Sequence, residues 1–146
     1  MFKRCAAAAV ALMLGGPVMA APLCDEMGFA GLLASCNRGE DIMLTLSSGK
    51  PLGEDTVLQS GAYYTLVIEA DGSAELAVEG PSFFRAIWMN EIVINKIEIR
   101  PMAIDSIEFD KAGVAELSFV AIKPGRHTLR IPGSTGETQQ ITLSIR

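Results

Sequence analysis

The sequence predicts an all-β protein, an antiparallel β-sandwich or barrel, on three observations. From Asp41 to the C-terminus, apolar and polar residues alternate with a period of two in seven to nine short runs, which is the pattern of half-buried strands. Turns rich in Gly, Pro and Asp separate these runs. No internal repeat, low-complexity tract or linker interrupts this part of the chain, so we expect one β domain.

The first 20 residues have the pattern of a secretory signal peptide. Lys3 and Arg4 precede an apolar run over residues 5–14, and small residues lead to a cleavage site after Ala20, with Ala21 as the second choice. A transmembrane anchor is the alternative, but it needs about 20 apolar residues, and Gly15-Gly16-Pro17 breaks this run. We therefore expect residues 1–20 to be removed and the mature protein to be periplasmic or secreted.

The chain is acidic, with 12 basic and 17 acidic residues and a formal net charge of −5. Losing Lys3 and Arg4 with the signal peptide leaves ten basic and 17 acidic residues, a charge of −7. Nucleic acids and anionic membranes bind clustered Lys and Arg, so we expect neither as a partner of the processed chain. Its roughly 125 residues make one domain that buries about two-thirds of its unfolded surface.

Cys24 and Cys36 remain after processing and are expected to form a disulfide, because an even pair in an exported chain is usually oxidised. On the chain-entropy account this bond stabilises the fold by about 3 kcal/mol. A metal or redox pair is the alternative, but the spacing is not C-x-x-C and no His lies nearby. Residues 21–41 are therefore predicted to be an N-terminal disulfide-bonded segment, followed by the β-sandwich over residues 42–146.

The strands are predicted from runs in which every second residue is apolar. Asp71-Gly72, between two of these runs, is a strong signal for a β-hairpin. Residues 85–91 are apolar without a clean period of two, so they form either a crossing loop or a bulged strand. The predicted strands are Ile42–Leu46 and residues 62–69, 74–79, 96–100, 106–110, 115–119, 127–131 and 141–145.

The order of turn motifs between these strands narrows the fold further. The motifs are G-P-S-F-F at residues 80–84, D-x-I-x-F at 105–109, L-x-F-V at 117–120, K-P-G at 123–125 and I-P-G at 131–133. Over residues 63–146 this layout resembles the cupredoxins, and more narrowly the periplasmic cupredoxin-like domains. The resemblance implies a Greek-key β-sandwich, which in that family usually holds one copper ion for electron transfer or copper handling.

The resemblance does not extend to the copper ligands. The family has a His where this chain has Glu75, Leu76 and Ala77, and a Cys where it has Ile131. The loop expected to hold a second His and an axial Met, residues 132–137, contains neither. Because a blue-copper centre needs two imidazoles and a thiolate, the resemblance implies the fold without type-1 copper.

His127 and the methionines are expected to be packing residues. His127, the only histidine, shares a strand face with Leu129. No second His or nucleophile motif accompanies it, so we expect no enzymatic activity. Thioether clusters can bind Cu(I), but the methionines lack close spacing and are expected to fill gaps in the core; they are Met27, Met43, Met89 and Met102.

Four carboxylates flank the predicted disulfide, which would bring them to one end of the molecule: Asp25, Glu26, Glu40 and Asp41. Ca²⁺ takes six or more oxygen ligands, and lanthanides are similar hard cations, so these residues are candidates for a hard-cation site. No calcium-loop motif supports the site, and a solvated acidic rim is the alternative interpretation.

An apolar group after Gly80-Pro81 is the candidate partner surface: Phe83, Phe84, Trp88 and Met89. Aromatic residues on a rigid scaffold are a common way to bind a partner. The alternative is that these residues plug one end of the sandwich.

The sequence therefore favours an exported, cupredoxin-like accessory or binding protein that acts through a protein partner in the periplasm. One alternative is a periplasmic binder of hard cations, Ca²⁺ or a lanthanide, through the four carboxylates. Another is an atypical copper-handling protein. No cofactor other than a hard cation is expected.

Overall fold

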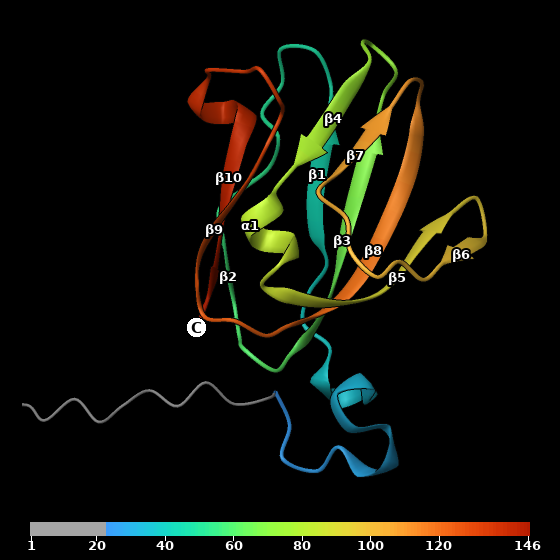
Figure 1. Ribbon diagram of the computed structural model, residues 1–146, viewed down its shortest axis with the longest axis vertical. Helices are drawn as coiled ribbons and strands as arrows, with labels where there is room; N and C mark the ends of the chain where they lie inside the picture. The colour runs from blue at the N-terminus through green and yellow to red at the C-terminus, as the bar shows by residue number, and fades with distance from the viewer. Residues whose placement is uncertain (1–22) are drawn as a thin grey trace, which may run out of the picture.

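The computed structural model describes residues 23–146, so the predicted signal peptide lies outside the described residues. Two five-stranded sheets pack face to face, and a short 3-10 helical segment lies below them (Figure 1). This confirms the predicted all-β sandwich. In the described part of the chain, no helix is long and apolar enough to span a membrane.

Each sheet draws its strands from distant parts of the chain. The first sheet has the order β1 (Ile42–Leu46), β3 (Tyr63–Ala70), β8 (Gly113–Ala121), β5 (Ile87–Ile94) and β6 (Ile97–Ile99). The second has the order β2 (Thr56–Leu58), β10 (Gln140–Ile145), β9 (Gly125–Arg130), β4 (Leu76–Glu79) and β7 (Ser106–Phe109). The helical elements are η1 (Gly28–Leu33), η2 (Ser35–Asn37), α1 (Pro81–Phe84) and η3 (Glu137–Gln139).

The described residues form ten strands, against the seven to nine predicted. The sequence missed β2, because Thr56-Val57-Leu58 places two apolar residues side by side and shows no alternation. The pattern over residues 85–91 allows either a crossing loop or a bulged strand, and the structure shows a bulged strand that begins at Ile87. The register of β5 against β8 shifts between Met89 and Glu91.

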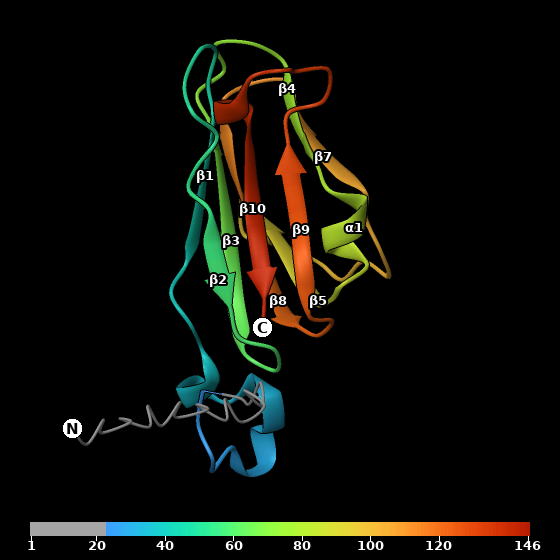
Figure 2. The same cartoon turned by 90° about the vertical axis from the view of Figure 1, so that its left-hand side faces the viewer.

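Two strand pairs are parallel, which the prediction of an antiparallel sandwich did not anticipate. β1 pairs with β3 and β2 pairs with β10 in parallel register. β1 and β2 are the end strands of their sheets, and both lie along the same side of the sandwich (Figure 2).

The turn at Asp71-Gly72 does not close a β-hairpin. β3 and β4, on either side of it, belong to different sheets. The Asp71 carboxylate accepts hydrogen bonds from Ser47 Oγ at 2.6 Å and from the Ser73 amide at 2.9 Å. These bonds fasten the turn to the end of β1, at the point where the chain crosses to the second sheet.

The core lies between the sheets and is built from the alternate residues that the periodicity selected. In β1 the buried residues are Ile42, Leu44 and Leu46, with Met43 and Thr45 exposed between them. Aromatic rings join the sheets: Phe83 from α1 stands edge-on to Phe119 of β8, with 5.3 Å between ring centroids. Such pairs add about 0.5–1.5 kcal/mol beyond the area they bury.

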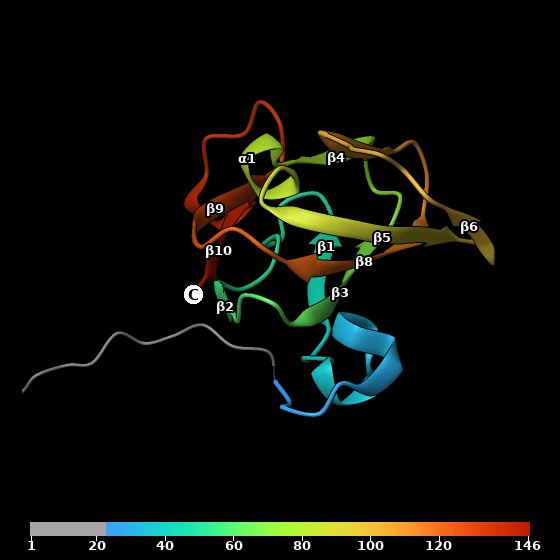
Figure 3. The same ribbon diagram turned by 60° about the horizontal axis from the view of Figure 1, so that its bottom comes forward.

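The N-terminal segment carries the Cys24–Cys36 disulfide, as predicted. Asn37, which is fully buried, fastens this segment to the sandwich. Its Nδ2 donates to the carbonyls of Leu32 at 2.9 Å and Gly61 at 2.8 Å, and its Oδ1 accepts from the Leu23 amide at 2.9 Å. Figure 3 shows the segment beside the start of β3, where Arg38 forms an isolated bridge to Tyr63.

Candidate functional site

The positions that the cupredoxin resemblance assigns to copper ligands do meet at one end of the sandwich. β4 begins there, and the chain turns there from β9 to β10 (Figures 1 and 2). Ile131 is buried in the place of the thiolate, Leu76 is half-buried, and Glu75 is exposed. These side chains offer no imidazole, thiolate or thioether, so the residues present do not fit a type-1 copper ion.

His127 lies away from that end, near the start of β9, and it is buried as predicted. Its Nε2 is 3.3 Å from the Lys123 carbonyl oxygen, and its ring centroid is 6.4 Å from that of Phe83. Nδ1 has no hydrogen-bond partner among the described residues. The side chain packs beneath α1, in agreement with a structural role.

The four candidate hard-cation residues are all exposed: Asp25, Glu26, Glu40 and Asp41. In residues 23–146, no group of three or more His, Cys, Asp or Glu side chains is arranged to hold a metal ion. The disulfide therefore does not gather these carboxylates into one site, contrary to the sequence-based expectation.

The predicted partner surface is wrong for Phe83 and Phe84. Phe83 is fully buried and Phe84 nearly so, because α1 turns both rings into the core beside β9. Met89 also packs against the core. Trp88 alone of the four is exposed, with half of its surface accessible.

Trp88 belongs to a row of side chains on the outer face of the first sheet. The register places Trp88 opposite Val120, and Val120 opposite Tyr63, so the three side chains lie on one face. Arg38 completes the row, with its guanidinium carbon 4.6 Å from the centroid of the Tyr63 ring. Tyr63 and Val120 are buried, which leaves Trp88 as the accessible aromatic end of the row.

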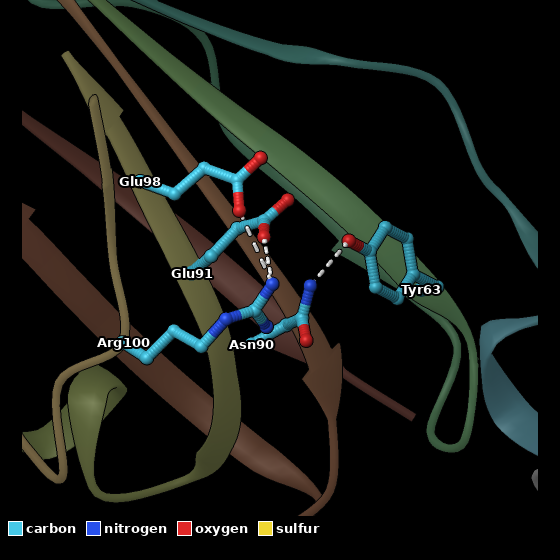
Figure 4. A network of polar contacts seen from close by, with 5 residues as sticks. All are labelled: Tyr63, Asn90, Glu91, Glu98 and Arg100. Carbon is cyan, nitrogen blue, oxygen red and sulfur yellow. Dashed lines mark hydrogen bonds and ion pairs between the residues drawn. The ribbon is translucent and has the colours of Figure 1, made fainter. Parts of the chain in front are cut away.

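The bulge in β5 places two polar residues, Asn90 and Glu91, beside this row (Figure 4). Asn90 Nδ2 donates to the Tyr63 hydroxyl at 3.2 Å. Arg100 pairs with Glu91 at 3.1 Å and with Glu98 at 3.3 Å, which links β5 to β6. A bulge aims consecutive side chains at the same face of a sheet, and here it fixes a polar border next to Trp88. The sequence showed only that residues 85–91 lacked a clean period of two.

Other apolar side chains are also exposed, and the sequence did not indicate them. Met43 and Met102 were expected in the core, yet Met43 is half exposed and Met102 fully exposed. Ile97 and Ile99 in β6 are exposed as well. Their alternation with Glu98 predicted a half-buried strand, but β6 is the end strand of its sheet and extends beyond the second sheet (Figure 1).

Comparison with known proteins gives a fold and no closer relationship. No family model matches the chain, and no curated protein matches it. The structure is similar to that of the blue copper oxidase from Nitrosomonas europaea, with a TM-score of 0.53 and 10% sequence identity over 72% of this chain. It also matches a multicopper oxidase from Campylobacter jejuni, with a TM-score of 0.46 and 8% identity over 74% of this chain.

These matches cover 43% of the Nitrosomonas protein and 30% of the Campylobacter protein. The described chain thus spans less than half the length of either oxidase. At 10% identity the first match shows the fold alone. The protein therefore has a cupredoxin-like fold, which agrees with the resemblance in its turn motifs.

Proposed function

We propose that the protein is an exported accessory protein of cupredoxin-like fold that acts by binding a protein partner in the periplasm, without a type-1 copper site. Export is supported by the leader-like first 20 residues and by the Cys24–Cys36 disulfide. The absence of suitable donors around Ile131 supports a scaffold that works without blue copper.

Trp88 is the observation that supports partner binding most directly. A half-exposed tryptophan is costly to leave in water, and tryptophan is among the residues most enriched at binding hot spots. It stands on a paired strand beside the ordered Tyr63–Asn90 contact. The backbone that carries it is therefore already ordered, which lowers the entropic cost of association.

The proposal is tested by placing a photo-reactive phenylalanine at position 88 and irradiating cells that export the protein. We expect one discrete adduct, which excess wild-type protein removes by competition and excess Trp88→Ala protein does not. The same photo-reactive residue at Val114, an exposed position in β8 of the same sheet, is the control. No adduct from position 88, equal adducts from both positions, or equal competition by Trp88→Ala would overturn the proposal.

The statement about copper has its own test. The mature chain is titrated with Cu(II), Cu(I), Ca²⁺ and a lanthanide while Trp88 fluorescence and the melting temperature are followed, because an ion that binds the native state raises the melting temperature. We expect no blue colour with Cu(II). A blue complex would contradict the proposal. Ca²⁺ or lanthanide binding that is lost when Asp25, Glu26, Glu40 and Asp41 are replaced would favour the hard-cation alternative instead.

A further inference from the structure

A groove runs between the end strands β1 and β2, on the side of the sandwich shown in Figure 2. Its volume is about 660 Å³. Residues 39–43 form one wall, and Gly53, Glu54, Thr56 and Val57 form the other. Tyr64 contributes to the lining and passes directly beneath Gly39, where a Cβ would collide with the ring.

The backbone of β1 presents an unpaired edge to this groove. The Thr45 amide donates to the Leu52 carbonyl at 2.8 Å and not to β3. Because amide directions alternate along a strand, the Met43 amide points to the same side. Gly53 approaches so closely that a Cβ there would lie 2.8 Å from the Met43 carbonyl oxygen. Beyond Gly53 the chain leaves β1 for β2, so the Met43 amide faces the groove without a partner in the described residues.

β2, which forms the facing wall, also presents to the groove a backbone edge that is unpaired among the described residues. The Arg146 amide donates to the Leu58 carbonyl at 2.9 Å, so the even-numbered residues of β2 direct their backbone groups towards β10. Val57 lies between Thr56 and Leu58, so its backbone N–H and C=O point the other way, towards the groove. The side chains of Leu23, Met43 and Val57 are each about half exposed along it. An open strand edge lined by apolar side chains is a template for adding another strand.

The charge of the groove selects among the chains that could lie there. Glu40, Asp41 and Glu54 line it, and no Lys or Arg does so among the described residues. A second copy of this chain would bring its own three carboxylates against these. A segment carrying Lys or Arg meets complementary charge, which raises the association rate and disfavours acidic competitors.

We propose that this groove binds an extended basic segment of a partner protein, which adds as a strand to the free edge of β1. The proposal rests on the partner-binding function proposed above and gives it a second surface and a chemical class of ligand. The Gly39 amide already donates to the Tyr63 carbonyl at 2.8 Å, and the Thr45 amide donates to Leu52. The open edge therefore runs from Asp41 to Met43, which at about 3.3 Å per residue is about 10 Å, enough for roughly three residues of an extended segment. Backbone hydrogen bonds to the Met43 amide supply affinity, and alternate Lys or Arg side chains supply specificity.

The test uses three synthetic eight-residue peptides with the mature protein. The first alternates Lys and Val, the second alternates Glu and Val, and the third is the first with alternate backbone nitrogens methylated. We expect the Lys-Val peptide to shift the Met43 amide resonance and to bind at least tenfold more tightly than the other two. Equal binding of the Glu-Val peptide, or of the methylated peptide, would overturn strand addition by a basic segment.

Variants separate the backbone from the side chain. Met43→Pro removes the outward amide, and an end strand tolerates proline when its amide is unpaired; we expect it to abolish binding. Met43→Leu retains the amide and is expected to bind as the wild type does. Joint replacement of Glu40, Asp41 and Glu54 by their amides should weaken binding at least tenfold. The same replacement of Glu98, Glu108 and Asp110, exposed elsewhere, changes the net charge equally and should not.

Two further outcomes are decisive. A dimer in sedimentation velocity that Met43→Pro abolishes would assign the groove to a second copy and overturn the proposal. Persistence of the adduct from position 88 with no peptide binding at Met43 would overturn this inference alone and leave the proposed function standing. Loss of the position-88 adduct with peptide binding intact would overturn the proposed function and leave the inference about the groove standing.

Discussion

At the scale of single residues, Asp71 shows how one side chain can fasten the connection between two strands. Its carboxylate accepts hydrogen bonds from Ser47 and Ser73. The Ser47 bond is the largest of the causes that lower the pKa of Asp71 from 3.8 to about 2. The charged form is thus the form that the folded protein favours. This preference links the stability of the fold to pH.

We predict that the native state loses the contribution of Asp71 in acid. Because the pKa is lower in the folded state than in the unfolded one, the contribution is complete above about pH 4 and disappears as the pH falls towards 2. Ser47→Ala should raise the pKa of Asp71 towards 3.8 and flatten this dependence. The measurement is the urea midpoint at pH 2 to 5, with Asp71→Asn as the control that cannot titrate. An unchanged slope in Ser47→Ala would contradict the prediction.

Residue type alone could not separate exposed side chains from buried ones. Phe83, Phe84 and Trp88 stand within six positions of one another, and all three are large and aromatic. Only the turn of α1, and the direction in which β5 leaves it, determine that two rings enter the core and one does not. The same limit applies to Met43, an apolar residue that occupies an outward position in a regular strand.

At the scale of elements, the β5–β6 hairpin closes on a common type of turn with an unusual residue, Lys96, at its second position. Asn95 and Lys96 have φ values of 50° and 67°, the left-handed conformation that a type I′ hairpin turn requires at both positions. Asn tolerates it, whereas Lys carries a steric cost of about 1–2 kcal/mol. The hairpin keeps Arg100 within reach of Glu91, beside Trp88.

We predict that Lys96→Gly stabilises the protein by about 0.5–1 kcal/mol, the relief of strain less the added entropy of an unfolded glycine. Urea denaturation measures the change. Lys111→Gly is the matched control, since Lys111 also lies in a connection but does not have a positive φ; it should be neutral or destabilising. Equal effects of the two substitutions would contradict the role assigned to the turn.

Elements with a full alternation were predictable, and those without it were not. β6, β8 and β10 alternate between apolar and polar residues and were found from sequence. β2 has Val57 next to Leu58, does not alternate and was missed. Asp71-Gly72 has the composition of a hairpin turn, yet it is bonded to Ser47 and joins strands of different sheets. A local turn motif carries no information about a partner 24 residues away.

At the scale of the whole molecule, the two sheets are joined by a small aromatic cluster. Phe83 contacts Phe84, Phe119 and His127, with ring centroids 5.6, 5.3 and 6.4 Å away. These residues come from α1, the first sheet and the second sheet. Removing the Phe83 ring would leave a cavity between all three.

We predict that Phe83→Ala destabilises the protein by about 3–5 kcal/mol, whereas Trp88→Ala changes stability by less than about 1 kcal/mol because its ring is half exposed. Phe83→Leu, expected to cost less than Phe83→Ala, keeps the comparison measurable if the alanine variant does not fold. The free energy of unfolding in urea gives all three values. A larger loss of unfolding free energy for Trp88→Ala than for Phe83→Ala would contradict the placement of Phe83 in the core and of Trp88 on the surface.

The fold class followed from periodicity, since alternation is a property of each strand by itself. The exposed surfaces did not, because exposure depends on what the opposite sheet covers. Ile97 and Ile99 alternate as core residues do, but β6 projects past the second sheet and leaves them in solvent. The groove beside β1 is harder still to predict from the sequence, because it depends on where the chain leaves one sheet for the other.

The parallel pairing of β2 fixes the order in which that groove can be completed. Thr56 aligns with Leu143 and Leu58 with Ile145, almost at the end of the chain. β2 therefore has no strand to pair with in its sheet until β10 has been synthesised. One wall of the groove forms only at that moment. A chain that lacks β10 cannot present this wall, so binding there would report that β10 has joined the second sheet.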